Sequence, residues 1–219
     1  MEISIIIPVY NEEKTVYEIL KTIFYYKKAK EVLVVNDGST DDTYNQIYPI
    51  KGIDYADKIK IIHLPKNTGK GNAVKVAFDY VSSDMVLLLD ADLVGLKENH
   101  LNLLVNGILN NNADMVIGLR DKKNLIKDKL MPYFPLTGGE RAIKTSVLKS
   151  ILKCSLIEGW GLEAVMNDYC KKKHLKVITV KLDDLDHIAG QTKKYGILSF
   201  VKECYDVIFT KIKLMGVKY

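Results

Sequence analysis

The sequence is poor in cysteine, and the few cysteines are badly spaced for structural cross-links. Its three cysteines, Cys154, Cys170 and Cys204, are odd in number and far apart, and no CxxC pair occurs. This pattern provides neither a disulfide framework nor a structural zinc site. It indicates a reduced protein, and we expect a cytoplasmic location.

Long hydrophobic runs and a strong charge of one sign are also missing. No apolar run approaches the roughly 18–20 residues that span a bilayer. The chain opens directly on an apolar strand-like segment, so we expect no cleavable signal. The net charge is only +5 and the lysines are scattered, so we expect no nucleic-acid partner. A mildly basic surface suits anionic ligands such as nucleotides, or an anionic membrane face.

Apolar strand-like segments alternate with helical patterns through the first 120 residues. Because these segments are apolar throughout, they are typical of a mostly parallel sheet covered by helices on both faces. The fold class is therefore α/β, with ligands expected at the carboxyl ends of the strands. The expected strands are 3–10, 31–37, 58–64, 85–90, 113–120 and 176–182, and the expected helices are 12–28, 41–50, 71–81, 97–111, 140–151 and 159–173.

Two carboxylates end the apolar run of the segment MVLLLDADLVGL. Asp90 and Asp92 are two positions apart, so in a strand their side chains point the same way and repel each other unless a positive charge lies between them. A divalent cation such as Mg²⁺ or Mn²⁺, which prefers oxygen ligands, would satisfy the pair. His187 could add a third ligand from a distant segment. The alternative is an ordinary polar strand end that faces water.

Two further strand ends carry polar groups. Asp37 follows the run VLVV and could accept hydrogen bonds from a ribose or a base, although Asn36-Asp37-Gly38 is also a good turn composition. The segment NTGKGN is not a Walker loop, because it lacks the first glycine and Gly71 follows Lys70. It leaves one lysine to reach a phosphate or base, or it is a plain helix start.

The segment GWGLEAVMNDY joins an aromatic ring to a carboxylate. Trp160 is the only tryptophan and lies between two glycines, so it could stack on a sugar ring. Glu163 could take a proton from a hydroxyl. The alternative is a helix start anchored by the tryptophan.

Four segments together resemble family 2 glycosyltransferases of GT-A fold. They are IIIPVYNEEKTV, VLVVNDGSTDDT, NTGKGNAVKVAF and LLLDADL, in that order along the chain. Farther on, GLR at 118–120, TGGERAIKTSVL and the segment from Gly159 resemble the acceptor half of polyprenyl-phosphate sugar synthases. The resemblance implies one domain over 1–219, with a nucleotide-sugar-binding half at 1–120 and an acceptor half with a C-terminal amphipathic helix at 121–219.

The resemblance also implies a role for each candidate residue. The donor is a nucleotide-diphosphate sugar linked to UDP or GDP, and the cofactor is Mg²⁺ or Mn²⁺. The implied nucleotide-pocket residues are Pro8, Tyr10 and Glu12, with Asp37 at the base or ribose and Lys70 near base or phosphate. The implied metal ligands are Asp92, Asp90 and His187, where Asp90 also contacts the ribose or a metal-bound water. Arg120 and Trp160 are expected to bind substrate, and Glu163 and Asp92 to be catalytic, with Glu163 as the base.

The function so indicated is metal-dependent transfer of a sugar from a nucleotide-diphosphate donor to an acceptor hydroxyl or phosphate, with inversion. An alternative is a membrane-surface polyprenyl-phosphate glycosyltransferase, docked by the basic loop 121–130 and the amphipathic stretch 195–215. A sugar nucleotidyltransferase would need a glycine-rich basic loop after the first strand, and the segment PVYNEE at that place is neither glycine-rich nor basic. A catalytically inactive binding module would not need every acidic position. Peripheral membrane contact and a homodimer are further hypotheses.

Overall fold

The computed structural model describes residues 1–48, 56–120, 138–157, 161–187, 213–214 and 216–217. The predicted basic loop at 121–130, Trp160 and almost all of the predicted amphipathic stretch at 195–215 therefore lie outside the described residues.

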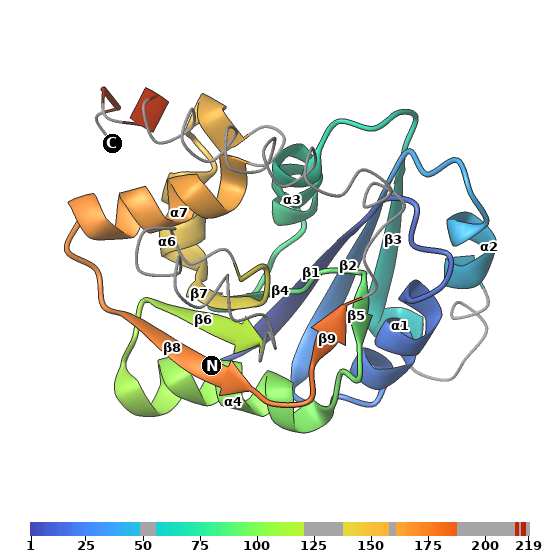
Figure 1. Ribbon diagram of the computed structural model, residues 1–219, viewed down its shortest axis with the longest axis horizontal. Coiled ribbons are helices and arrows are strands. Elements are labelled where there is room, and N and C mark those ends of the chain that lie inside the picture. Colours follow the sequence, from blue (N-terminus) through green and yellow to red (C-terminus); the bar gives the residue numbers. More distant parts are fainter. Residues whose placement is uncertain (49–55, 121–137, 158–160, 188–212, 215, 218–219) are drawn as a thin grey trace, which may run out of the picture.

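A seven-stranded sheet forms the centre of the molecule (Figure 1), in the order β3-β2-β1-β4-β7-β6-β8. β1 pairs in parallel with β2 and β4, β2 with β3, and β6 with β8, whereas β7 runs antiparallel to both of its neighbours. The prediction of a mostly parallel sheet is confirmed. The strands are β1 (Ile3–Val9), β2 (Ala29–Asp37), β3 (Ile59–Leu64), β4 (Met85–Leu88), β6 (Met115–Arg120), β7 (Arg141–Lys144) and β8 (Val177–Leu182).

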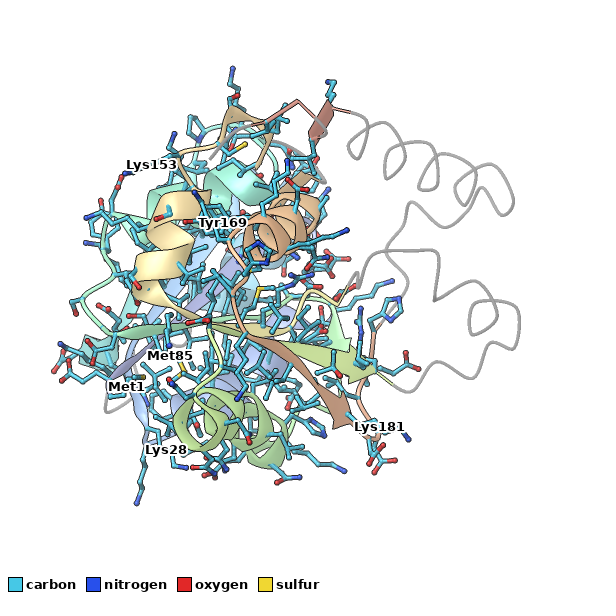
Figure 2. The ribbon with its side chains drawn as sticks, turned by 90° about the vertical axis from the view of Figure 1, so that its left-hand side faces the viewer. Met1, Lys28, Met85, Lys153, Tyr169 and Lys181 are labelled. Carbon is cyan, nitrogen blue, oxygen red and sulfur yellow. The ribbon has the colours of Figure 1, made fainter. Side chains whose placement is uncertain are left out.

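Helices cover both faces of the sheet, as the apolar strands predicted. One core joins the sheet to α1 (Val16–Phe24), α2 (Thr43–Ile47) and α4 (Glu98–Asn111). The other joins it to α3 (Lys70–Phe78), α6 (Thr145–Ile151) and α7 (Gly161–Lys172). Figure 2 shows these layers from the side, with Met85 among the strands, α4 below it and Tyr169 of α7 above it.

The alternation of side chains along β1 explains why its sequence has no polar face. Ile5 and Ile7 pack in the core of α1 and α4, whereas Ile6 packs in the core of α3 and α7. Each fully buried isoleucine contributes about 1.5–3 kcal/mol to folding. A strand buried on both faces is apolar at nearly every position, with the hydrogen-bonded Ser4 as the exception in β1, and this made the sheet readable from the sequence.

The structure corrects the prediction of a helix over 140–151. The helix begins only at Thr145, and Arg141–Lys144 is the strand β7, inserted between β4 and β6. Arg141 pairs with Leu88 of β4, so a charged residue occupies a strand position in the interior of the sheet. A strand of four residues that contains an arginine is too short and too polar to show a regular pattern of apolar residues. It is recognised as a strand only from its pairing with β4 and β6.

Two short strands were not predicted either. β5 (Leu93–Val94) and β9 (Asp186–His187) pair antiparallel and form a separate two-stranded sheet. The 3₁₀ helices are η2 (Ala56–Lys58) and η3 (Ser155–Ile157). Within the described ranges, no helix has the length and apolar character needed to cross a bilayer.

Gly71 allows an unusually close contact between α3 and η3. A Cβ atom at this position would lie 1.7 Å from the carbonyl oxygen of Ile157. We expect Gly71→Ala to lower the free energy of unfolding by roughly 2–3 kcal/mol, because backbone must move to admit the methyl group. Urea unfolding measures the loss. Gly216→Ala is the matched control, since no atom of the described residues lies within 4 Å of its Cβ, and an equal effect of both variants would contradict the prediction.

Candidate active site

The loops after β1 and β2 lock together at the carboxyl edge of the sheet. The Asn11 amide donates to Ser39 Oγ at 3.0 Å, and the Thr40 amide donates to Asn11 Oδ1 at 2.8 Å. Asn11 has φ of 56°, a left-handed conformation that asparagine tolerates better than most residues. The resulting frame holds Pro8 half-buried and leaves Tyr10 exposed at the surface. Their predicted contacts with a nucleotide stay predictions.

Asp37 holds the loop that leads into α3. Its side chain is buried, and its Oδ1 accepts hydrogen bonds from the amide and the hydroxyl of Thr68, both at 2.8 Å. Its Oδ2 accepts from the Gly69 amide, also at 2.8 Å. A carboxylate suits the positive end of a helix. The geometry therefore gives Asp37 a structural role that the sequence did not reveal, while its contact with a base or ribose stays a prediction.

Lys70 joins the two halves of the predicted site. It is the first residue of α3, and its Nζ lies 2.5 Å from Asp90 Oδ1 and 2.5 Å from Glu163 Oε1. Burial alone would lower the pKa of Lys70, but the two carboxylates hold it above its ordinary value. Burial would raise the pKa of Asp90, and the Lys70 ammonium outweighs that effect and keeps it low. Asp90 therefore remains ionised beside a fixed positive charge.

The carboxyl group of Asp92 differs from that of Asp90 in its charge environment and in its hydrogen bonding. Burial, and next the charge of Asp90, raise its pKa above the ordinary value. Its Oδ1 is buried, and no described residue forms a hydrogen bond with it. Burial and the charge of Asp92 also raise the pKa of Glu12, to about 7. Negative charge is thus concentrated around Asp92 without a compensating donor at Oδ1.

This charge pattern fits a divalent cation. Mg²⁺ is commonly held by one or two carboxylates that leave room for water and substrate phosphate oxygens. Asp92 and Asp90 offer such oxygens. Oδ1 of Asp92 is available to coordinate a cation, because no described residue donates a hydrogen bond to it. Across the described ranges, no group of three or more histidine, cysteine or acidic residues is placed to hold a metal. The described residues therefore supply only part of a coordination shell, which leaves positions for water and phosphate oxygens.

His187 reaches this region through the small second sheet. The β5–β9 pairing sets it opposite Leu93, the residue after Asp92. Its Nδ1 lies 3.5 Å from Asp186 Oδ1. Pairing thus brings together segments that are far apart in the sequence, but metal ligation by His187 stays a prediction.

A buried ion pair lies close to Asp90. Arg120, at the end of β6, has its Nη1 3.6 Å from Oε1 of Glu140, whose side chain is fully buried. Burial, followed by the charge of Asp90, raises the pKa of Glu140 to about 7. Gly139 packs directly on Asp90, because its Cβ would lie 2.0 Å from Asp90 Oδ2. Arg120 is thus close to the site, and its contact with substrate stays a prediction.

Glu140 and Arg141 were missed in the sequence. Arg141 is fully buried and donates hydrogen bonds to the Gly138 carbonyl and to Asn167 Oδ1 of α7, both at 2.8 Å. It thereby ties β7 to the helix that carries Glu163. The adjacent charges in the segment TGGER were the available signal, but the sequence predicted only the start of a helix there.

Glu140→Gln should flatten the pH dependence of stability. Because the pKa of Glu140 is higher in the folded than in the unfolded protein, the folded state binds more protons between about pH 4.5 and pH 7. The stability that Glu140 contributes is therefore lost as pH rises through about 7. Urea unfolding of wild type and variant at several pH values measures this slope. The exposed Glu18→Gln is the control, and an unchanged slope in Glu140→Gln would contradict the prediction.

Comparison with known proteins identifies the family of the chain. The model of the family described as Glycosyl transferase family 2 matches residues 4–153. A dolichyl-phosphate beta-glucosyltransferase of Trichomonas vaginalis is 33% identical over 136 residues, which are 54% of this chain and 39% of that protein. A poly-beta-1,6-N-acetyl-D-glucosamine synthase of Staphylococcus aureus is 37% identical over 93 residues, 42% of this chain and 22% of that protein. The chain thus spans less than half the length of these relatives.

Solved structures share the fold over the whole chain. Glucosyl-3-phosphoglycerate synthase of Mycobacterium tuberculosis, in complex with Mn²⁺, uridine diphosphate and phosphoglyceric acid, superposes with a TM-score of 0.75. The identity is 21%, and the match covers 100% of this chain and 80% of that one. The same enzyme in complex with Mg²⁺ and uridine diphosphate also gives a TM-score of 0.75, at 20% identity. These matches confirm the predicted GT-A fold.

Proposed function

Because the chain belongs to glycosyl transferase family 2, we propose that it transfers a sugar from a nucleotide-diphosphate donor, linked to UDP or GDP, to an acceptor hydroxyl or phosphate. One observation carries the proposal: Lys70 brings Asp90 from the carboxyl edge of the parallel strands next to Glu163 from the acceptor half. An anionic donor and an acceptor can therefore meet at one point of the fold.

Each residue has a distinct task in the proposed reaction. The frame around Tyr10 and the loop held by Asp37 receive the nucleoside, and the Lys70 ammonium faces the diphosphate. Glu163 accepts the proton of an acceptor hydroxyl, whose oxygen bonds to the anomeric carbon as the bond from that carbon to the diphosphate breaks. Attack from the side opposite the leaving group inverts the anomeric configuration.

Asp92 and Asp90 would hold the Mg²⁺ or Mn²⁺ that the proposed reaction uses. When bound, such an ion neutralises charge that develops on the leaving diphosphate. The support from this chain is the buried Oδ1 of Asp92, to which no described residue donates a hydrogen bond, together with the raised pKa of its carboxyl group. The solved relative in complex with Mn²⁺ and uridine diphosphate supports the same choice of ion.

A nucleotide screen tests the proposal. Unfolding temperatures are measured with UDP, GDP and their glucose and mannose conjugates, each with Mn²⁺, with Mg²⁺ or with EDTA. A ligand that binds only the folded state raises the unfolding temperature. We expect one nucleotide series to do so in the presence of metal and to lose the effect in EDTA. No shift with any nucleotide would remove the basis of the proposal.

A second candidate is transfer to a lipid phosphate at a membrane surface. It is favoured by the identity of 33% to the dolichyl-phosphate beta-glucosyltransferase. A phosphate acceptor is already ionised and has less need of a base than a hydroxyl. Release of nucleoside diphosphate from the donor is measured with farnesyl phosphate in detergent and with 3-phosphoglycerate. A rate increase with the lipid alone would select this candidate, and an increase with the soluble acid alone would exclude it.

A further inference from the structure

A single ammonium group serves two carboxylates with different tasks. Asp90 belongs to the proposed donor site and Glu163 is the proposed base, and both lie 2.5 Å from Lys70 Nζ. Lys70 and Glu163 are 93 residues apart in the sequence. The side chains of Lys70, Asp90 and Glu163 are 26%, 23% and 16% exposed, so water screens these ion pairs only in part.

Tight backbone packing fixes this arrangement. Gly71, next to Lys70, leaves no room for a Cβ against Ile157 of η3. Gly161, at the start of α7, likewise leaves none against the Leu156 carbonyl oxygen, which a Cβ would approach to 2.0 Å. The starts of α3 and α7 therefore meet on the same short segment, and Glu163 follows two residues later. The contact between Lys70 and Glu163 is part of how the two helices pack.

We propose that Lys70 is a latch that couples the two half-sites: Glu163 competes with the donor diphosphate for the Lys70 ammonium. The inference rests on the proposed function, because it requires an anionic donor beside Asp90. An ammonium has three N–H donors, and the two carboxylates use two of them, so a diphosphate that accepts more than one hydrogen bond from Lys70 must displace a carboxylate. An arriving diphosphate offers several strong acceptors, so Lys70 turns toward it and releases Glu163. Glu163 becomes available to the acceptor only when the donor is in place, and Lys70 is a positioning residue for it.

The latch predicts that removal of the proposed base increases the affinity for nucleotide. Glu163→Gln removes the competitor for Lys70, so we expect the affinity for UDP or GDP, whichever the nucleotide screen selects, to rise about fivefold although the variant lacks the base. Lys70→Met should lower that affinity about tenfold. In the Lys70→Met background, Glu163→Gln should change the affinity less than twofold, because no ammonium remains to be contested.

Isothermal titration calorimetry with the free nucleoside diphosphate in Mg²⁺ or Mn²⁺ measures these affinities for the full chain. Asp168→Asn is the matched control on α7. Asp168 forms its ion pair with Lys172, at 2.8 Å, and not with Lys70, so we expect this variant to leave nucleotide affinity unchanged. The nucleoside without phosphates serves as a second control ligand, and this control uses no Lys70 variant. Glu163→Gln should leave nucleoside affinity unchanged, because nucleoside does not contest the ammonium.

Each other outcome overturns the latch. An unchanged or weaker diphosphate affinity in Glu163→Gln shows that Glu163 does not compete for Lys70. If Glu163→Gln raises diphosphate affinity equally in the wild-type and the Lys70→Met background, the effect is charge repulsion between Glu163 and the ligand. An equal gain for nucleoside and diphosphate shows a change in pocket shape. Failure of the wild type to bind any nucleotide contradicts the proposed function itself, whereas normal binding with an unchanged Glu163→Gln contradicts the latch alone.

Discussion

Asp92→Asn is expected to weaken metal-dependent binding of nucleoside diphosphate strongly and, at the same time, to stabilise the ligand-free protein. An amide oxygen is a much weaker ligand for Mg²⁺ or Mn²⁺ than a carboxylate, so we expect the metal-dependent part of the affinity to fall by roughly 100-fold. Titration of the nucleotide in the presence of metal and in EDTA measures that part separately.

The gain in stability follows from the raised pKa of Asp92. Burial and the charge of Asp90 disfavour the ionised carboxyl group in the folded protein. A carboxyl group whose pKa is higher in the folded state lowers stability as pH rises through that pKa. The neutral amide removes this penalty, so we expect a higher unfolding temperature at neutral pH. The gain should vanish at acidic pH, where the carboxyl group is protonated in both states.

Asp79→Asn is the control for Asp92→Asn, because Asp79 is an exposed residue at the end of α3. It should change neither the metal dependence nor the stability. Wild-type, metal-dependent affinity in Asp92→Asn would exclude Asp92 from the proposed metal site. A loss of stability in the ligand-free variant would show that its Oδ1 has a partner in solution.

Glu163→Gln is expected to reduce turnover by about 10²–10⁴-fold with a hydroxyl acceptor. The amide cannot accept the proton that the acceptor hydroxyl must lose, whereas binding of the donor does not need that proton transfer. Steady-state release of nucleoside diphosphate gives kcat and the donor KM separately. We expect kcat to fall and the donor KM not to rise.

The choice between the two carboxylates of α7 can be tested by their amide variants. Asp168 lies five residues after Glu163 on α7, and it forms an ion pair with Lys172 one turn along the same helix. Asp168→Asn should keep most of the turnover. If instead Asp168→Asn loses turnover and Glu163→Gln keeps it, the base is Asp168. If neither variant loses turnover, the acceptor needs no base, as expected for a phosphate acceptor.

Much of the fold was readable from the sequence because its strands are apolar on both sides. The run from Met85 to Leu89 predicted a buried strand, and the structure places β4 there, paired in parallel with β1. The position of Asp90 and Asp92 just beyond this strand followed from the same run. By contrast, Arg141–Lys144 is a strand only because it lies between β4 and β6, and nothing local in its sequence distinguishes it from a helix.

The sequence alone determined the kind of fold and the kinds of chemical group at the edge of the sheet, because hydrophobic periodicity and residue type are local properties. Only the tertiary structure decided which of those groups meet. It set Lys70 between Asp90 and Glu163, buried Glu140 against Arg120, and left Asp92 with an oxygen that lacks a donor among the described residues. Distances between side chains depend on strand order and on how closely helices such as α3 and α7 approach each other. The close contacts of Gly71 and Gly161 with η3 set that approach, and hydrophobic periodicity does not reveal them.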